Sequence, residues 1–137
     1  MSDTRPKTLM DFVKEARAQI EEIDGDTLTR MLEEKPDLLL VDVREPSEHE
    51  HGHLPGAHLV PRGILEAAAD PQFPKHDQTL VAARDQLVVV YCATGGRSAM
   101  AAWTLRLMGY QKAYSLAGGF MKWAEEQRPL VREASYV

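Results

Sequence analysis

Two short apolar runs most strongly limit what this chain can fold into. Residues 38–43 (LLLVDV) and 87–91 (LVVVY) have the length of β-strands, and neither alternates apolar with polar residues as a half-exposed strand does. Near-continuous runs of this kind are typical of strands buried on both faces, as in a parallel sheet. The two runs therefore predict the centre of a sheet that is covered on both sides.

The rest of the chain alternates helical with strand-like patterns. Helices are predicted over residues 8–19, 27–34, 46–51, 64–69, 98–108 and 120–127, a helical turn over 79–84, and short strands over 57–60 and 112–116. Asp26 and Ser98 are the expected N-caps of two of these helices, and Gly109 is an expected C-cap. The alternation predicts a small α/β fold with a central, mainly parallel sheet and helices on both faces.

The bulk properties of the chain exclude several classes of protein. Its 137 residues suffice for one domain with its own core. A net charge of −5 argues against nucleic-acid binding over the whole surface, and no apolar run approaches the roughly 20 residues that span a bilayer. One cysteine excludes an internal disulfide and, with no signal-peptide core, predicts a cytoplasmic location.

The single cysteine, Cys92, has the surroundings of a reactive thiol. It directly follows the second apolar run and precedes a loop of small residues and the start of a helix. The N–H groups of such a loop and the helix dipole stabilise a thiolate, which lowers a cysteine pKa from about 8.5 to roughly 3.5–7.5. Arg97 adds a cation that attracts anions. Cys92 is therefore predicted to be a nucleophile, the alternative being a small buried apolar residue.

Three histidines alternate shortly after the first run. On a strand, His49, His51 and His53 would point the same way, as zinc ligands do. Gly52 and Pro55 break any regular strand there, and no cysteine is nearby in the sequence. We therefore expect no metal site, but a hydrogen-bonded structural His53 with two exposed neighbours.

Five motifs resemble, in their order and spacing, those of the rhodanese-like sulfurtransferases. They are residues 42–44 (DVR) with Glu48, 52–58 (GHLPGAH), 92–98 (CATGGRS), 109–110 (GY), and 116–120 (LAGGF) with Trp123. The resemblance implies a single rhodanese-like domain over residues 21–130. Residues 1–20 are then an N-terminal helical extension, and residues 131–137 a C-terminal tail.

The resemblance also implies a chemistry that needs no cofactor. The thiolate of Cys92 takes a sulfane sulfur from a donor, becomes a persulfide and passes the sulfur to a nucleophilic acceptor. The loop that holds the anionic sulfur consists of Ala93, Thr94, Gly95, Gly96, Arg97 and Ser98. Asp42, Arg44 and His53 are expected to support this loop, since Asp42 ends a strand at the same edge of the sheet.

This chemistry implies two partners, a sulfur donor and a sulfur acceptor. The expected donor is thiosulfate or a low-molecular-weight persulfide, and the expected acceptor is cyanide, a thiol or a protein. Because the chain has no second cysteine, the acceptor must come from outside. The apolar stripe of the helix over 8–19 suits either a homodimer or a cap on the sheet.

Two other functions stay open. In cysteine-dependent phosphatases five residues separate the cysteine from an arginine that clamps phosphate, whereas Arg97 stands one residue earlier and Ser98 takes the matching position. The shorter loop makes a ring better suited to one extra sulfur atom than to a phosphate. A sulfur carrier or a binding module without turnover would also keep Cys92.

Overall fold

A parallel five-stranded sheet forms the centre of the computed structural model, which describes residues 5–132. The strands are β1 (Glu22–Ile23), β2 (Leu39–Asp42), β3 (His58–Leu59), β4 (Val88–Tyr91) and β5 (Ala113–Leu116), in the order β1-β5-β4-β2-β3. All four neighbouring pairs are parallel, which confirms the predicted sheet. Residues 1–4 and 133–137, parts of the predicted extension and tail, lie outside the described residues.

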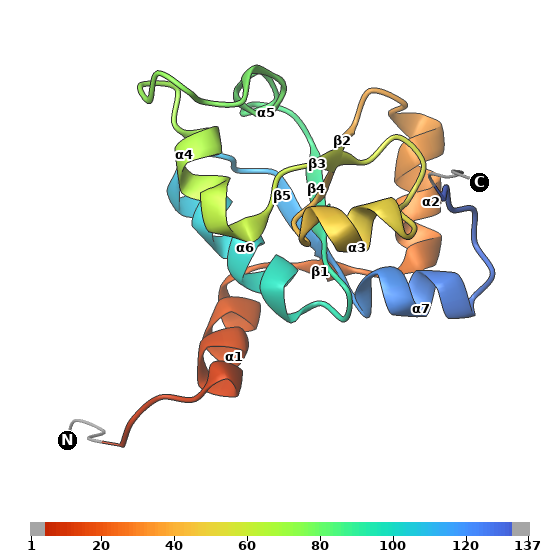
Figure 1. Ribbon diagram of the computed structural model, residues 1–137, viewed down its shortest axis with the longest axis horizontal. Helices are drawn as coiled ribbons and strands as arrows, with labels where there is room; N and C mark the ends of the chain where they lie inside the picture. The colour runs from red at the N-terminus through yellow and green to blue at the C-terminus, as the bar shows by residue number, and fades with distance from the viewer. Residues whose placement is uncertain (1–4, 133–137) are drawn as a thin grey trace.

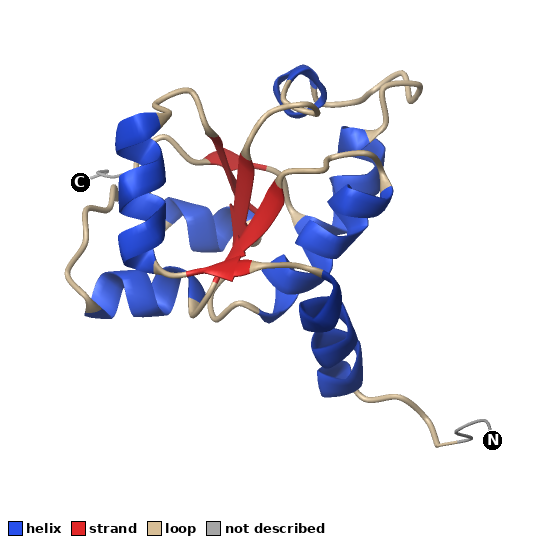
Figure 2. Ribbon diagram, turned by 180° about the vertical axis from the view of Figure 1, so that it is seen from behind, coloured by secondary structure: helices blue, strands red, loops and turns tan. Residues whose placement is uncertain are grey.

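Helices lie on both sides of this sheet (Figures 1 and 2), as predicted. They are α1 (Leu9–Gln19), α2 (Gly25–Glu34), α3 (Pro46–Glu50), the 3₁₀ turn η1 (Arg62–Ile64), α4 (Leu65–Ala69), α5 (Gln78–Ala82), α6 (Gly96–Leu107) and α7 (Gly119–Glu125). The helices α4, α5 and α6 pack on one face of the sheet, and α2 and α7 on the other.

Successive residues of β4 point into two different cores, because side chains alternate along a strand. Val88, Val90 and Cys92 belong to the core under α4, α5 and α6. Val89 and Tyr91 belong to the core under α2 and α7. All five residues are 0–1% exposed. Cys92 directly follows the last residue of β4, and it faces the side of the sheet that carries α6.

Two predicted helix starts and one strand need correction. The N-cap of α2 is Asp24, whose side chain accepts a hydrogen bond from the Thr27 N–H at 2.8 Å, and not Asp26. The N-cap of α6 is Gly95, and Ser98 lies inside the helix. Strand β1 was not predicted, because two residues are too short for any periodicity.

Helix α1 packs along α6, and its apolar stripe is only partly covered. Val13 and Ala16 are buried, whereas Leu9 and Phe12 are 67% and 48% exposed. Figure 1 shows the N-terminal end of the helix projecting from the body of the protein. None of the helices within residues 5–132 has the length and apolar character that crossing a membrane requires.

Candidate active site

The loop between β4 and α6 places Cys92 at the carboxyl edge of the sheet. Gly95 has a φ of 109°, in the left-handed region that only glycine enters without strain, and this turn allows α6 to begin at the next residue. Gly96 does not have a positive φ, so of the two loop glycines only Gly95 uses the left-handed conformation. A methyl group on Gly96 would instead lie 3.4 Å from Val13 of α1.

The sulfur of Cys92 is buried and accepts hydrogen bonds from the loop. Its Sγ lies 3.1 Å from the backbone nitrogen of Gly95 and 3.4 Å from that of Ser98. Burial raises the pKa of the thiol, but donation by the Ser98 hydroxyl and by the amides of Ser98, Gly95 and Thr94 outweighs it, so the pKa of Cys92 is lowered. The loop therefore favours the thiolate.

Three other loop amides that were expected to surround the sulfur do not bond to it. Among the hydrogen bonds of residues 5–132, none joins the amide of Ala93, Gly96 or Arg97 to Sγ of Cys92. The backbone hydrogen bonds to the sulfur of Cys92 thus come from Gly95 and from Ser98 in the first turn of α6.

A buried pair of hydroxyls lies behind the loop. The Oγ atoms of Ser98 and Ser115 are 2.8 Å apart, and both residues are fully buried. The Ser98 hydroxyl also lies 3.2 Å from the carbonyl oxygen of Gly95. Ser115, from β5, was not among the predicted site residues, although it is a polar residue in an otherwise buried strand.

The start of α7 closes the site from the other side. The Phe120 N–H donates to the Cys92 carbonyl at 2.8 Å, and the Met121 N–H donates to that of Ala93 at 3.0 Å. Gly119 has a φ of 59°, and a methyl group on it would lie 2.5 Å from the Cys92 carbonyl oxygen. The Gly118–Gly119 turn therefore lies at the active edge, and only glycine permits this close approach.

An ion pair stands beside the thiol. Arg97 donates to both carboxylate oxygens of Glu48 from α3, at 2.8 and 3.0 Å. This pairing lowers the pKa of Glu48 to about 2 and raises that of Arg97, with a smaller contribution to Arg97 from the charge of Cys92. The side chains of Arg97 and Glu48 are 37% and 33% exposed, so the pair faces solvent at the edge of the site.

A second ion pair, between Asp42 and Arg44, is buried at the end of β2. Arg44 donates from Nη2 to Asp42 at 2.8 Å and from Nε at 3.0 Å, and the Tyr91 hydroxyl donates to Asp42 at 3.1 Å. The guanidinium of Arg44 also lies 4.5 Å from the ring centre of Phe120. Asp42 and Arg44 thus contact Tyr91, which precedes Cys92 in the sequence, and Phe120, whose N–H donates to the Cys92 carbonyl.

The three alternating histidines lie in different surroundings, and His51 is the exposed one. His53 is buried, and its Nδ1 donates to the carbonyl of Leu54 at 2.9 Å. The ring of His49 stacks on that of His53 and its Nδ1 lies 2.9 Å from Asp42, so His49 is not the exposed residue expected. Within the described residues no group of acidic, histidine and cysteine side chains is arranged to hold a metal ion.

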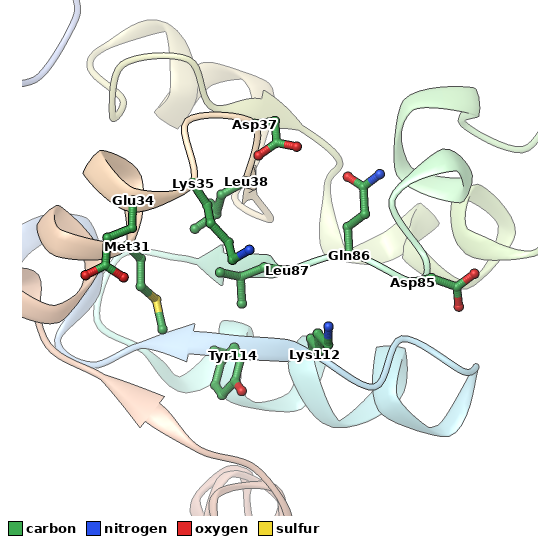
Figure 3. A pocket seen from close by; sticks show the side chains of 10 residues that line it. All are labelled: Met31, Glu34, Lys35, Asp37, Leu38, Asp85, Gln86, Leu87, Lys112 and Tyr114. Carbon is green, nitrogen blue, oxygen red and sulfur yellow. The ribbon is translucent and has the colours of Figure 1, made fainter.

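Two recesses lie at opposite ends of the sheet. A recess of about 340 Å³ borders the site and is lined by Arg44, Ser47, Glu48, His51, Gly52 and Phe120. A recess of about 420 Å³ lies at the amino ends of the strands (Figure 3), lined by residues that include Met31, Leu87 and Tyr114. Because ligands of parallel sheets bind at the carboxyl ends of the strands, the recess lined by Glu48 and Phe120 lies at the edge where a ligand is expected.

Both the sequence and the fold of the chain match known proteins. The family model of the rhodanese-like domain matches residues 24–126. The chain belongs to the rhodanese-like domain family. A sulfurtransferase of Allochromatium vinosum is 34% identical over 112 residues, which are 82% of this chain and 95% of that protein. A probable adenylyltransferase/sulfurtransferase of Mycobacterium tuberculosis is 34% identical to this rhodanese-like chain over 92 residues, which are 67% of this chain and 21% of that longer protein.

Solved structures show the same fold. A protein of unknown function from Rhodopseudomonas palustris, described as a possible tyrosine phosphatase, has a TM-score of 0.84 and 32% identity over 96% of this chain and 99% of its own. The polysulfide-sulfur transferase homodimer of Wolinella succinogenes has a TM-score of 0.68 and 31% identity over 90% of this chain and 87% of its own. The rhodanese fold predicted from the sequence is confirmed.

Proposed function

We propose that the protein is a sulfurtransferase that carries a sulfane sulfur on Cys92. The observation that supports this best is the buried sulfur with two loop amides directed at it and a lowered pKa. Membership of the rhodanese-like family adds weight, since the Allochromatium relative is a sulfurtransferase. Arg97 and Ser98 complete the proposed loop, and Asp42, Arg44 and His53 are proposed to support it.

The proposed reaction has two steps. The thiolate of Cys92 attacks the outer sulfur of thiosulfate or of an organic persulfide, forms a new S–S bond, and releases sulfite or a thiolate with the electron pair of the broken bond. A nucleophile such as cyanide or a thiolate then attacks the outer sulfur of the Cys92 persulfide. The electron pair returns to Cys92 as thiolate, so neither step needs an added oxidant or reductant.

Phosphate ester hydrolysis is the other reaction open to a thiolate in this fold, and the Rhodopseudomonas structure carries that suggestion in its description. Two features of the site argue against it here. The guanidinium of Arg97 already donates to both carboxylate oxygens of Glu48. In addition, Ser98 stands at the position where a phosphatase has the arginine that binds phosphate. A sulfur carrier without turnover would share every contact described above and is separated only by assay.

The organisation around the site is part of the proposal. We place the rhodanese-like domain at residues 21–130, with a helical extension over 1–20 and a tail over 131–137. A homodimer would cover the exposed Leu9 and Phe12 of α1, and the Wolinella transferase is described as a homodimer. A reducing compartment such as the cytoplasm suits an enzyme whose nucleophile is a free thiol.

Steady-state sulfur transfer tests this function. Thiocyanate formation from cyanide is measured with thiosulfate and with glutathione persulfide as donors, for the wild type and for Cys92→Ser. We expect turnover with at least one donor and none with Cys92→Ser, whose urea unfolding curve stays close to that of the wild type. Turnover retained in Cys92→Ser, or none in the wild type with either donor, would contradict the proposal.

A further inference from the structure

Three arginines at this end of the described chain, residues 5–132, are paired with carboxylates. Glu48 holds Arg97 through two hydrogen bonds, and Asp42 holds Arg44. Further ion pairing comes from the N-terminal helix, where Nε of Arg17 lies 3.3 Å from Glu22. Arg17 is close to the loop, because a methyl group on Gly95 would lie 3.5 Å from its Nη2. The positive charge around the thiol is therefore largely compensated.

Lysine does not restore the missing charge. The aliphatic part of the Lys122 side chain, from α7, packs against Gly118. Lys122 is exposed, so water and salt screen the charge of its ammonium group. The fixed positive field at Cys92 comes instead from loop amides and the helix terminus, which suit a single negative charge.

The two classes of donor load this site with different amounts of charge. Thiosulfate is a dianion, so attack by a thiolate brings three negative charges together and leaves a sulfite dianion beside the new persulfide. An organic persulfide in its protonated form, R–S–SH, is neutral at the reacting end. Attack on its outer sulfur breaks the S–S bond and releases R–S⁻, while the proton stays on the transferred sulfur. The organic donor therefore needs fewer uncompensated cations.

We propose that Glu48 sets the donor specificity of the enzyme by occupying Arg97, so that the site prefers an organic persulfide to thiosulfate. This inference rests on the proposed sulfur transfer. Arg97 belongs to the loop that follows Cys92 and its side chain is 37% exposed, and its forked N–H groups match two oxygens of a sulfonate as well as two of a carboxylate. Thiosulfate would have to displace Glu48 to use them.

The neighbouring recess is suited to the organic part of such a donor. It begins at Glu48 itself, has a volume of about 340 Å³, and is bordered by the ring of Phe120 and by His51. Thiosulfate has no group that would extend into this space. A peptide-like thiol such as glutathione has one, and its carboxylates lie far from the reacting sulfur.

The test compares kcat/KM for thiosulfate and for glutathione persulfide, with cyanide as acceptor and Cys92→Ser as the blank. Glu48→Gln removes the charge but keeps the oxygen that accepts the Glu45 N–H at 3.0 Å, so the start of α3 is retained. Glu66→Gln is the matched control, because it makes the same change in net charge and breaks a 2.8 Å pair with Arg62 away from the loop. Glu48→Met serves as a second variant.

We expect the wild type to prefer glutathione persulfide. Glu48→Gln should shift the ratio of the two kcat/KM values about tenfold toward thiosulfate, since it removes the charge and one of the two oxygens that hold Arg97, and a charge-assisted hydrogen bond is of that size. Glu66→Gln should leave the ratio unchanged. A wild type that prefers thiosulfate, or a ratio unchanged in both Glu48 variants, would overturn the inference while leaving sulfur transfer intact. No turnover with either donor would overturn the proposed function and this inference with it.

Discussion

Replacing Asp42 with asparagine tests how the site is held. The carboxylate of Asp42 is fully buried and accepts hydrogen bonds from Arg44, His49 and Tyr91, at 2.8–3.1 Å. Asparagine would place its uncharged amide beside the guanidinium of Arg44. Arg44 is only 4% exposed, and it would keep its positive charge there without a counter-ion. Breaking one side of a buried ion pair destabilises a protein by about 3–5 kcal/mol, a large fraction of the roughly 5–15 kcal/mol of a typical domain.

The loss is measured by urea unfolding, with Asp26→Asn as control. At an m-value of about 2 kcal/mol/M, Asp42→Asn should lower the midpoint by roughly 2 M. Asp26 pairs with Arg128 at 2.7 Å but its side chain is 75% exposed, so its replacement should change the free energy of unfolding by less than about 1 kcal/mol. Equal, small losses in both variants would refute the idea that the Asp42–Arg44 pair holds the site.

The same variant has a predicted pH dependence. Burial raises the pKa of Asp42, but the hydrogen bonds from Arg44 and His49 outweigh it, so the pKa in the folded state is lowered. A carboxylate with a depressed folded pKa contributes stability above its unfolded pKa of about 3.9 and loses it as the pH falls further. The stability difference between wild type and Asp42→Asn should therefore shrink below about pH 4, and a difference that grows in acid would contradict this account.

Three further predictions concern Cys92, the loop that follows it, and the start of α7. Alkylation of Cys92 by iodoacetamide should reach half its maximal rate below pH 8, and a rate that rises only above that value would show that the loop does not stabilise the thiolate. Ser98→Ala should raise that midpoint and Ser98→Thr should leave it near the wild-type value, because the Ser98 hydroxyl is one of the groups that lower the pKa of Cys92; equal midpoints in the wild type and in Ser98→Ala would exclude the hydroxyl. Gly119→Ala should destabilise the fold by about 2–3 kcal/mol in urea and Gly56→Ala by about 1 kcal/mol, since both have positive φ but only Gly119 meets a neighbouring backbone; equal losses would contradict the close packing of α7.

The strands and most helices could be predicted because their signals are local. The run over residues 38–43 contains β2, and the run over 87–91 contains β4, since an apolar sequence of that length has few other places in a small α/β protein. Strand β1 could not, because its two residues owe their conformation to pairing with β5. The start of α2 was misplaced because Asp24 and Asp26 are both good capping residues, and only the path of the chain decides between them.

The residues of the site could be predicted only where they lie next to one another in the sequence. The position of Cys92 between a strand and a helix could be predicted directly from the sequence, and so could the loop of small residues that follows it. Glu48 stands in one of the motifs, yet nothing in the sequence shows that it holds Arg97, which is 49 residues away. Ser115 contacts Ser98 across 17 residues and looks like an ordinary strand residue. Contacts of this kind depend on tertiary distance, which no local pattern encodes.

The most direct test of the account is the mass of the intact protein after exposure to a sulfur donor. Wild type and Cys92→Ser are each incubated with thiosulfate or with glutathione persulfide, freed of excess donor, and measured before and after reduction. The account predicts that the wild type alone gains the mass of one sulfur atom, more readily from glutathione persulfide, and loses it on reduction. The same gain in Cys92→Ser, or no gain in the wild type with either donor, would contradict the claim that Cys92 carries the sulfur.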